Sequence, residues 1–557
     1  MTLTGITELR FFPALLRLTV SLLLIGWIFA GVVNADDEAT RDRRHRQLLE
    51  KRDAILDGLR GDLESVETWC NEHNQSEAIP TLKQIELQLL SPDTEAEPPR
   101  AVTPEVDKTL AMEEQQWRLQ VQHHRKTRSI EMYSLARSAL RAGFLSMAFS
   151  IVRDVIRIDS DHKDARSILG KQIYRDPLKK DDALYSGEWV SAFEKKMRSS
   201  GKVYRHEYGW LPTANVARYE QNLRPWKGDW ISVEKEAEQR RDFRNAWEVP
   251  SEHFLVKTNV SLEAGVQLSE QLELFHSWLQ QNFAAFFETP QALQDRFEKA
   301  GQRSSSRKDK PMEVHYYATR EEYQRRVEGK VPANIETNGL YWRNDRTSYF
   351  FQNREKRDFS TLFHEATHQI LDVDTIEDRR IAARTRAVKL KQRNVEEWPL
   401  CESSNFWIIE GLACYFESFE VVDGEVAVGR PDYPRFDKAR QRVVDPSIYF
   451  YTPSSKFLTL GRAEFLENPD LAGPRYSQAA GFVHFLMHYD DGLYRDDLIT
   501  LLTALYRPSG DSLLREPSLT RIAGVSYDDL DHQYRTHMQN LTDKLKASGA
   551  IEEVSQP

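Results

Sequence analysis

Residues 359–371 read FSTLFHEATHQIL. The apolar side chains of this stretch recur with the three- and four-residue spacing of a helix that buries one face. They are Phe359, Leu362, Phe363, Ala366 and Ile370. The same stretch contains His364, Glu365 and His368. We therefore expect a partly buried helix that carries three residues suited to metal chemistry.

His364 and His368 stand four positions apart. Four residues advance an α-helix by about 400°, so both imidazoles lie on one face and reach one ion. Glu365 is offset from that face, where a carboxylate can accept a proton from a water molecule at the open side of the ion. Residue frequencies give roughly 0.03 chance matches to this pattern in a chain of this composition. The motif predicts a site for one Zn²⁺ ion.

A catalytic zinc site needs a third protein ligand and an open fourth position. Glu410 is the favoured candidate, in the predicted helix 407–417 with the sequence WIIEGLACYFE, and it follows His368 by 42 residues. The small residues Gly411 and Ala413 would let this helix approach the first one closely. Glu402 and Glu417 are the rival ligands.

The pattern around these helices predicts an α+β fold for residues 251–545. Strands are expected at 253–257 and 312–318, each followed by a helix. Residues 339–343 and 347–352 flank the turn-forming Asn-Asp-Arg and predict a hairpin. An exposed edge on the second hairpin strand would allow an extended peptide to pair with it.

The part of the chain before this domain has a different character. Residues 36–185 have helical patterning, and a helix pair at 133–143 and 144–159 resembles a single tetratricopeptide-like unit. A plain helical bundle is the alternative. Residues 186–250 are predicted to be a connector in which Gly-Trp elements recur about every twenty residues. Residues 546–557 form a tail.

The N-terminus has the pattern of a secretory signal. Arg10 and Arg17 flank an apolar run at 18–33, and small residues precede a predicted cleavage site after Ala35. We expect residues 1–35 to be a signal peptide and the protein to be exported to the periplasm, the cell envelope or the medium. An uncleaved anchor is the alternative. No later apolar stretch is long enough to predict a membrane span.

Composition and the remaining sequence patterns exclude some partners and assign structural roles to other residues. The formal net charge of −10 and the lack of a nucleic-acid-binding motif argue against nucleic-acid partners. Three cysteines are too few for a disulfide scaffold; Cys401 and Cys414 are the most plausible pair, although packed free thiols are favoured. A basic run at 379–393 is expected to be a solvated face, with a lid over the site as the alternative. His484 and His488 repeat the four-residue spacing within an apolar helix and are interpreted as structural.

The two motifs together resemble the gluzincin (peptidase MA-like) metallopeptidases, in which a His-Glu-x-x-His helix is followed by a Trp-x-x-Glu-Gly-x-Ala helix. The stretch 251–545 is also similar to a bacterial family known only as a domain of unknown function. The resemblance implies that His364, His368 and Glu410 are metal ligands and that Glu365 is the general base. It further implies that Tyr476 lies near the oxyanion. Cys414 departs from the pattern, because some relatives place a supporting carboxylate there.

These observations predict an exported, zinc-dependent metallopeptidase that hydrolyses a peptide or protein substrate. The alternative is a catalytically silent zincin-like domain in a scaffold protein of the cell envelope. In that case the helical N-terminal region would bind a protein partner.

Overall fold

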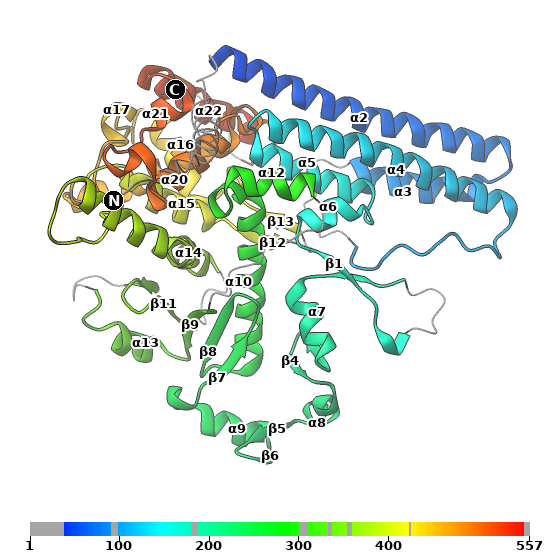
Figure 1. The fold of residues 1–557 in the computed structure, drawn as a ribbon, viewed down its shortest axis with the longest axis horizontal. Helices are drawn as coiled ribbons and strands as arrows, with labels where there is room; N and C mark the ends of the chain where they lie inside the picture. The colour runs from blue at the N-terminus through cyan, green and yellow to red at the C-terminus, as the bar shows by residue number, and fades with distance from the viewer. Residues whose placement is uncertain are drawn as a thin grey trace, which may run out of the picture.

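The computed structural model describes residues 38–90, 99–179, 186–299, 310–331, 337–353, 359–422 and 425–550. The predicted signal peptide, residues 1–35, lies outside these residues. Among the helices described, none is long and apolar enough to cross a membrane. A long helical arm joins a body in which helices surround a mixed sheet (Figure 1). This combination of helices and sheet confirms the α+β fold class.

Four helices build the arm, namely α2 (Glu38–Glu72), α3 (Ile79–Leu90), α4 (Met112–Arg141) and α5 (Leu145–Ile158), and the short α6 (Lys163–Ile168) follows. Helices α2 and α4 lie side by side along its length (Figure 1). The predicted helix pair is confirmed as α4 and α5. Gly143 joins them with φ +89°, a left-handed conformation that favours glycine.

Part of the body completes the apolar core of the arm. Helix α12 (Pro290–Glu298) inserts Leu293 and Phe297 into the buried cluster of the arm. The backbone amide and hydroxyl of Ser146, in α5, donate to Asp496 of α20 (Arg495–Tyr506) at 2.9 and 2.7 Å. Arg41 of α2 pairs with the adjacent Asp497. Apolar packing and charged contacts therefore both hold the arm against the body.

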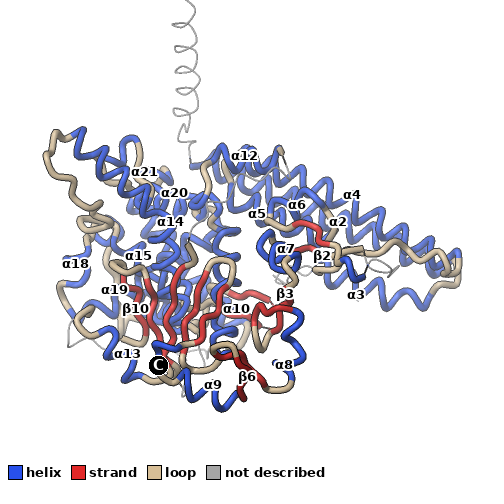
Figure 2. Tube along the Cα trace, turned by 60° about the horizontal axis from the view of Figure 1, so that its bottom comes forward, coloured by secondary structure: helices blue, strands red, loops and turns tan. Residues whose placement is uncertain are grey.

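Three antiparallel strand pairs follow the arm: β1 (Gln172–Tyr174) with β2 (Glu188–Val190), β3 (Lys202–Arg205) with β4 (Gly209–Pro212), and β5 (Leu223–Trp226) with β6 (Asp229–Ser232). Strand β1 lies within residues 36–185, which were expected to be helical, because it pairs with a strand of the predicted connector. A short helix follows each pair, namely α7 (Ala192–Ser199), α8 (Val216–Glu220) and α9 (Val233–Arg240) (Figure 2). Trp189, Trp210 and Trp230 each lie in the second strand of a pair. The Gly-Trp spacing thus reflects a strand-pair and helix unit used three times.

The body contains a five-stranded sheet. Its strands are β7 (Trp247–Pro250), β8 (Phe254–Thr258), β9 (Met312–Tyr317), β10 (Gly339–Trp342) and β11 (Thr347–Phe351), in the order β10-β11-β9-β8-β7. Strands β8, β9 and β11 run parallel, and the outer strands are antiparallel to their neighbours. The predicted hairpin is confirmed as β10 and β11. The expectation that its second strand offers an edge was wrong, because β11 lies between β10 and β9. Of the two hairpin strands, β10 is the one at an edge of the sheet.

Helices α10 (Leu262–Asn282), α11 (Ala284–Phe287) and α13 (Arg320–Val327) interleave with the strands of the sheet along the chain. The remaining helices of the body are α14 (Ser360–Lys389), α15 (Phe406–Phe416), α16 (Pro434–Val444), α17 (Ser454–Phe457), α18 (Arg462–Leu466), α19 (Pro469–His488), α21 (Leu519–Ala523) and α22 (Tyr527–Ala547). The small hairpin of β12 (Glu420–Val422) and β13 (Glu425–Ala427) follows α15.

Helix α14 extends well beyond the predicted residue 371, so most of the basic run 379–393 is a continuation of the motif helix. Most basic side chains of the run are exposed, as expected for a solvated face: Arg380, Arg384, Lys389, Lys391 and Arg393. Arg379 is the exception, because it is buried and pairs with Asp372, two turns earlier in the helix.

Candidate metal centre

His364 and His368 project from one face of α14, as their four-residue spacing predicts. Their Nε2 atoms lie 3.3 Å apart, and 17% and 18% of the two side chains is exposed. The opposite face of the helix is anchored in the core by Leu362, Phe363, Ala366 and Ile370. The imidazole pair is thus held rigidly from behind, yet remains within reach of solvent.

Glu410 reaches the same point from α15. Its Oε2 atom lies 3.7 Å from Nε2 of His364 and 3.9 Å from Nε2 of His368. Gly411 keeps α15 tight against α19, since a Cβ atom there would stand 2.8 Å from the carbonyl oxygen of Ala479. The structure therefore brings together the three residues that the sequence nominated as ligands, in a group that can hold a metal ion.

The geometry of the group fits a tetrahedral cation. Bonds of about 2.0–2.2 Å place neighbouring ligand atoms roughly 3.3–3.6 Å apart at a tetrahedral angle. The three edges measured here are 3.3, 3.7 and 3.9 Å. Two imidazole nitrogens and one carboxylate oxygen also leave a fourth position for water or substrate.

Electrostatics at the group favour a bound cation. Burial raises the pKa of the Glu410 carboxyl. Burial and the neighbouring His364 lower the pKa of His368 to about 4. Burial opposes charge on His364 as well, but hydrogen bonds with Cys414 and Glu417 outweigh it and raise the pKa of this imidazole. Burial thus disfavours a charged Glu410 carboxylate, and a divalent cation bound beside it would offset that cost.

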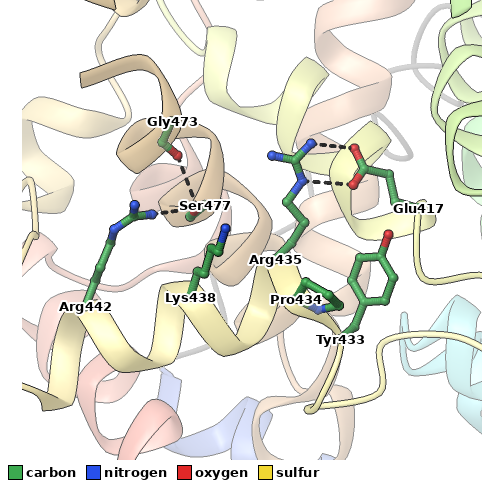
Figure 3. A pocket seen from close by; sticks show the side chains of 8 residues that line it. All are labelled: Glu417, Tyr433, Pro434, Arg435, Lys438, Arg442, Gly473 and Ser477. Carbon is green, nitrogen blue, oxygen red and sulfur yellow. Dashed lines mark hydrogen bonds and ion pairs between the residues drawn. The ribbon is translucent and has the colours of Figure 1, made fainter. Parts of the chain in front are cut away.

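The Nδ1 side of His364 is supported by Glu417, at the C-cap of α15. Glu417 Oε1 lies 3.0 Å from Nδ1, and Arg435 donates to both oxygens of the same carboxylate at 2.8 and 3.0 Å (Figure 3). Burial would raise the pKa of Glu417, but these hydrogen bonds lower it to about 2. An ionised carboxylate thus fixes the ring orientation that directs Nε2 toward the metal position.

Sequence reasoning weighed Glu417 only as a rival ligand and missed this supporting role. The signal that could have found it is its position seven residues after Glu410, which returns to a similar helix face after two turns. The other rival, Glu402, is 55% exposed and faces Arg462 at 3.9 Å, outside the ligand group.

Cys414 lies next to His364. It forms a second compact group with His364 and Glu417. Cys401 and Cys414 are both buried and unpaired with each other, in agreement with the favoured expectation of free thiols. Burial raises the pKa of the Cys414 thiol, which favours its neutral form.

Glu365 follows His364 in α14 and reaches the outer strand β10 of the sheet. Its Oε2 accepts a hydrogen bond from the backbone amide of Tyr341 in β10 at 2.7 Å. The Tyr341 hydroxyl in turn donates to Asp372, two turns after Glu365 in α14, at 2.7 Å. The carboxylate of Glu365 is therefore located between the ligand group and the exposed edge of strand β10.

Tyr476 lies inside α19 and is half-buried against the core. Burial, followed by the charges of Glu410 and Cys414, raises its pKa, so its hydroxyl stays protonated and lies within electrostatic range of the ligand carboxylate. The sequence placed Tyr476 at a helix start, whereas the helix begins at Pro469 and continues through Pro474.

His484 and His488 lie on the same helix but do not join the ligand group. His484 contacts His537 at 3.0 Å and the carbonyl oxygen of Gly429 at 2.9 Å, and His488 contacts the Tyr415 hydroxyl at 2.8 Å. Burial lowers the pKa of His484 to about 4. These neutral, hydrogen-bonded rings fit the structural role expected from the sequence.

Comparisons with known proteins add no assignment: the chain matches no protein-family model and no curated protein.

Proposed function

We propose that the protein is an exported, zinc-dependent peptidase of the gluzincin type. The observation that carries the proposal is the convergence of His364 Nε2, His368 Nε2 and Glu410 Oε2 within 4.8 Å of one another, on two helices that the core holds in place. Two imidazoles and one carboxylate form a ligand set used by catalytic zinc. The N-terminal signal pattern is the support for export.

Each side chain has a distinct role in the proposed reaction. His364, His368 and Glu410 hold the ion, and Glu417 orients His364. A zinc ion bound there would supply Lewis acidity, polarising a peptide carbonyl and making a water molecule more acidic. Glu365 accepts the proton of the attacking water and transfers it to the departing amine. The protonated hydroxyl of Tyr476 donates to the oxygen on which negative charge develops.

Strand β10 provides a place for an extended substrate. Within the described residues it has one strand neighbour, β11, and the Tyr341 amide already points outward to Glu365. A peptide running along this edge would gain backbone hydrogen bonds and pass beside the general base. This arrangement supports a peptide over a small-molecule substrate.

The decisive experiment compares metal content and cleavage in Glu365→Gln and His368→Ala. Glu365→Gln should bind zinc stoichiometrically and lose peptide hydrolysis, because Gln cannot accept the proton. His368→Ala should lose both. Glu377→Gln, on the exposed side of the same helix, is the control and should match the wild type. Full hydrolysis by Glu365→Gln would refute the assigned base.

The second candidate function is that of a catalytically inactive protein that binds a protein partner. The observation that favours it is a set of large apolar side chains that remain exposed on α3 and α4, namely Leu87, Met112, Leu119 and Ile130. Stoichiometric zinc without cleavage of any member of a peptide library would select this function.

A further inference from the structure

A cavity of about 270 Å³ lies beside Glu417, at the end of α15, and is lined by residues of α16 and α19. Its lining includes three cationic side chains of one helix, Arg435, Lys438 and Arg442. Positions three and four apart share a helix face, so these cations point into the same space (Figure 3). The hydroxyl of Ser477 lines the opposite wall.

The positive charge in this cavity is only partly balanced. Arg435 is neutralised by its two hydrogen bonds with Glu417. Arg442 donates to the Ser477 hydroxyl at 2.7 Å, and among the described residues neither Arg442 nor Lys438 has a carboxylate partner. Like charges four residues apart on a helix repel each other. An anion placed in the cavity would relieve that repulsion and gain charge-assisted hydrogen bonds.

The cavity is connected to the proposed reaction site by two direct links. Glu417 lines the cavity and contacts His364, a proposed ligand. Ser477 lines it as well and follows Tyr476, the proposed oxyanion donor, in α19. These two links place the cavity next to residues that are proposed to act at the metal centre.

We propose that this cavity is a substrate subsite that binds a carboxylate of the peptide through Lys438 and Arg442. The substrate part of the inference rests on the proposed peptidase function, whereas binding of the carboxylate does not. The carboxylate comes either from an acidic side chain or from the C-terminus of the peptide. The volume is sufficient for one such group with part of its chain.

Three small probes separate these sources. N-acetyl-glutamate α-amide carries only the side-chain carboxylate, N-acetyl-glutamine carries only the C-terminal one, and N-acetyl-glutamine α-amide is neutral. Binding to the full chain is measured by calorimetry or NMR titration, with inorganic phosphate as a fourth probe. At least one acid should bind, and the neutral amide should not.

The matched variants are Lys438→Glu and Lys456→Glu; Lys456 is an exposed lysine of α17 away from the cavity. Lys438→Glu should raise the dissociation constant of the acid about tenfold or more, while Lys456→Glu should leave it unchanged. If the carboxylate bound only at a metal, Lys438→Glu would leave its dissociation constant unchanged. Equal binding in both variants, or equal binding of the neutral amide, overturns the subsite.

Peptide cleavage then tests the substrate part separately. Lys438→Glu should raise KM for peptides with the preferred carboxylate and leave kcat nearly unchanged. Binding of phosphate alone would overturn the subsite. Carboxylate binding that depends on Lys438, in a protein that cleaves no peptide, would support the cavity as a carboxylate site and refute the peptidase function.

Discussion

Glu417 sets the orientation of His364 although it lies outside the proposed ligand group. Its carboxylate joins an imidazole on one side to a guanidinium on the other, so a single residue links three helices of the site. Such outer hydrogen bonds fix the tautomer of a ligating histidine and increase its basicity. Cys414 also hydrogen-bonds to His364, but of the two partners only Glu417 is a carboxylate that Arg435 holds in place.

Replacing Glu417 with Gln tests whether the charge of this carboxylate supports His364. The amide keeps the shape of the side chain but loses the charge that Arg435 and His364 share, so zinc affinity should fall roughly 10- to 100-fold. Competition with a chelator measures the change. Glu420→Gln, at a half-exposed glutamate just beyond the helix, serves as the control. Unchanged affinity in Glu417→Gln would show that the carboxylate is not needed to support the site.

Among the secondary-structure elements, the contact of α15 with α19 places Glu410. Gly411 is the point of closest approach, where a Cβ atom would stand 2.8 Å from the Ala479 carbonyl oxygen and 3.0 Å from a Val483 methyl group. Gly411→Ala should cost about 1–3 kcal/mol of the free energy of unfolding through overpacking and should weaken metal binding by displacing Glu410.

Denaturant unfolding and metal titration of the same variant measure both effects. Gly61→Ala is the contrasting change, because Gly61 lies in α2 with no atom within 4 Å of its added methyl group. It should stabilise the protein by about 0.5–1 kcal/mol through helix propensity. A neutral Gly411→Ala would mean that α15 and α19 are less tightly packed than described.

The elements also show where sequence patterns stop being informative. The pairing of His364 with His368 follows from helix geometry alone, and the hairpin of β10 and β11 follows from its turn, so both were predictable. The position of β11 inside the sheet depends on pairing with β9, which is distant in sequence. The length of α14 was missed because Arg379 has the polarity of a surface residue, yet it is buried on Asp372.

At the level of the whole molecule, residues of the body complete the apolar core of the arm. Phe297 of α12 is 2% exposed and packs edge-on against Phe149 of α5, with ring centroids 5.4 Å apart. A helix that follows the first part of the sheet in the chain is therefore part of the arm's interior. Since α12 packs in the arm and α5 is hydrogen-bonded to α20, we expect the two parts to unfold together.

Phe297→Ala removes the shared aromatic contact and should cost about 3–5 kcal/mol of the free energy of unfolding. Because Phe297 belongs to α12 of the body and packs in the core of the arm, scanning calorimetry should show the main transition shifted to lower temperature without splitting. Leu119→Ala, at a half-exposed position of α4, should change stability by only about 0.5 kcal/mol or less. If Phe297→Ala produced two transitions of which only one moved, the arm would be an independent folding unit, and its contacts with α20 would have to be regarded as docking between domains.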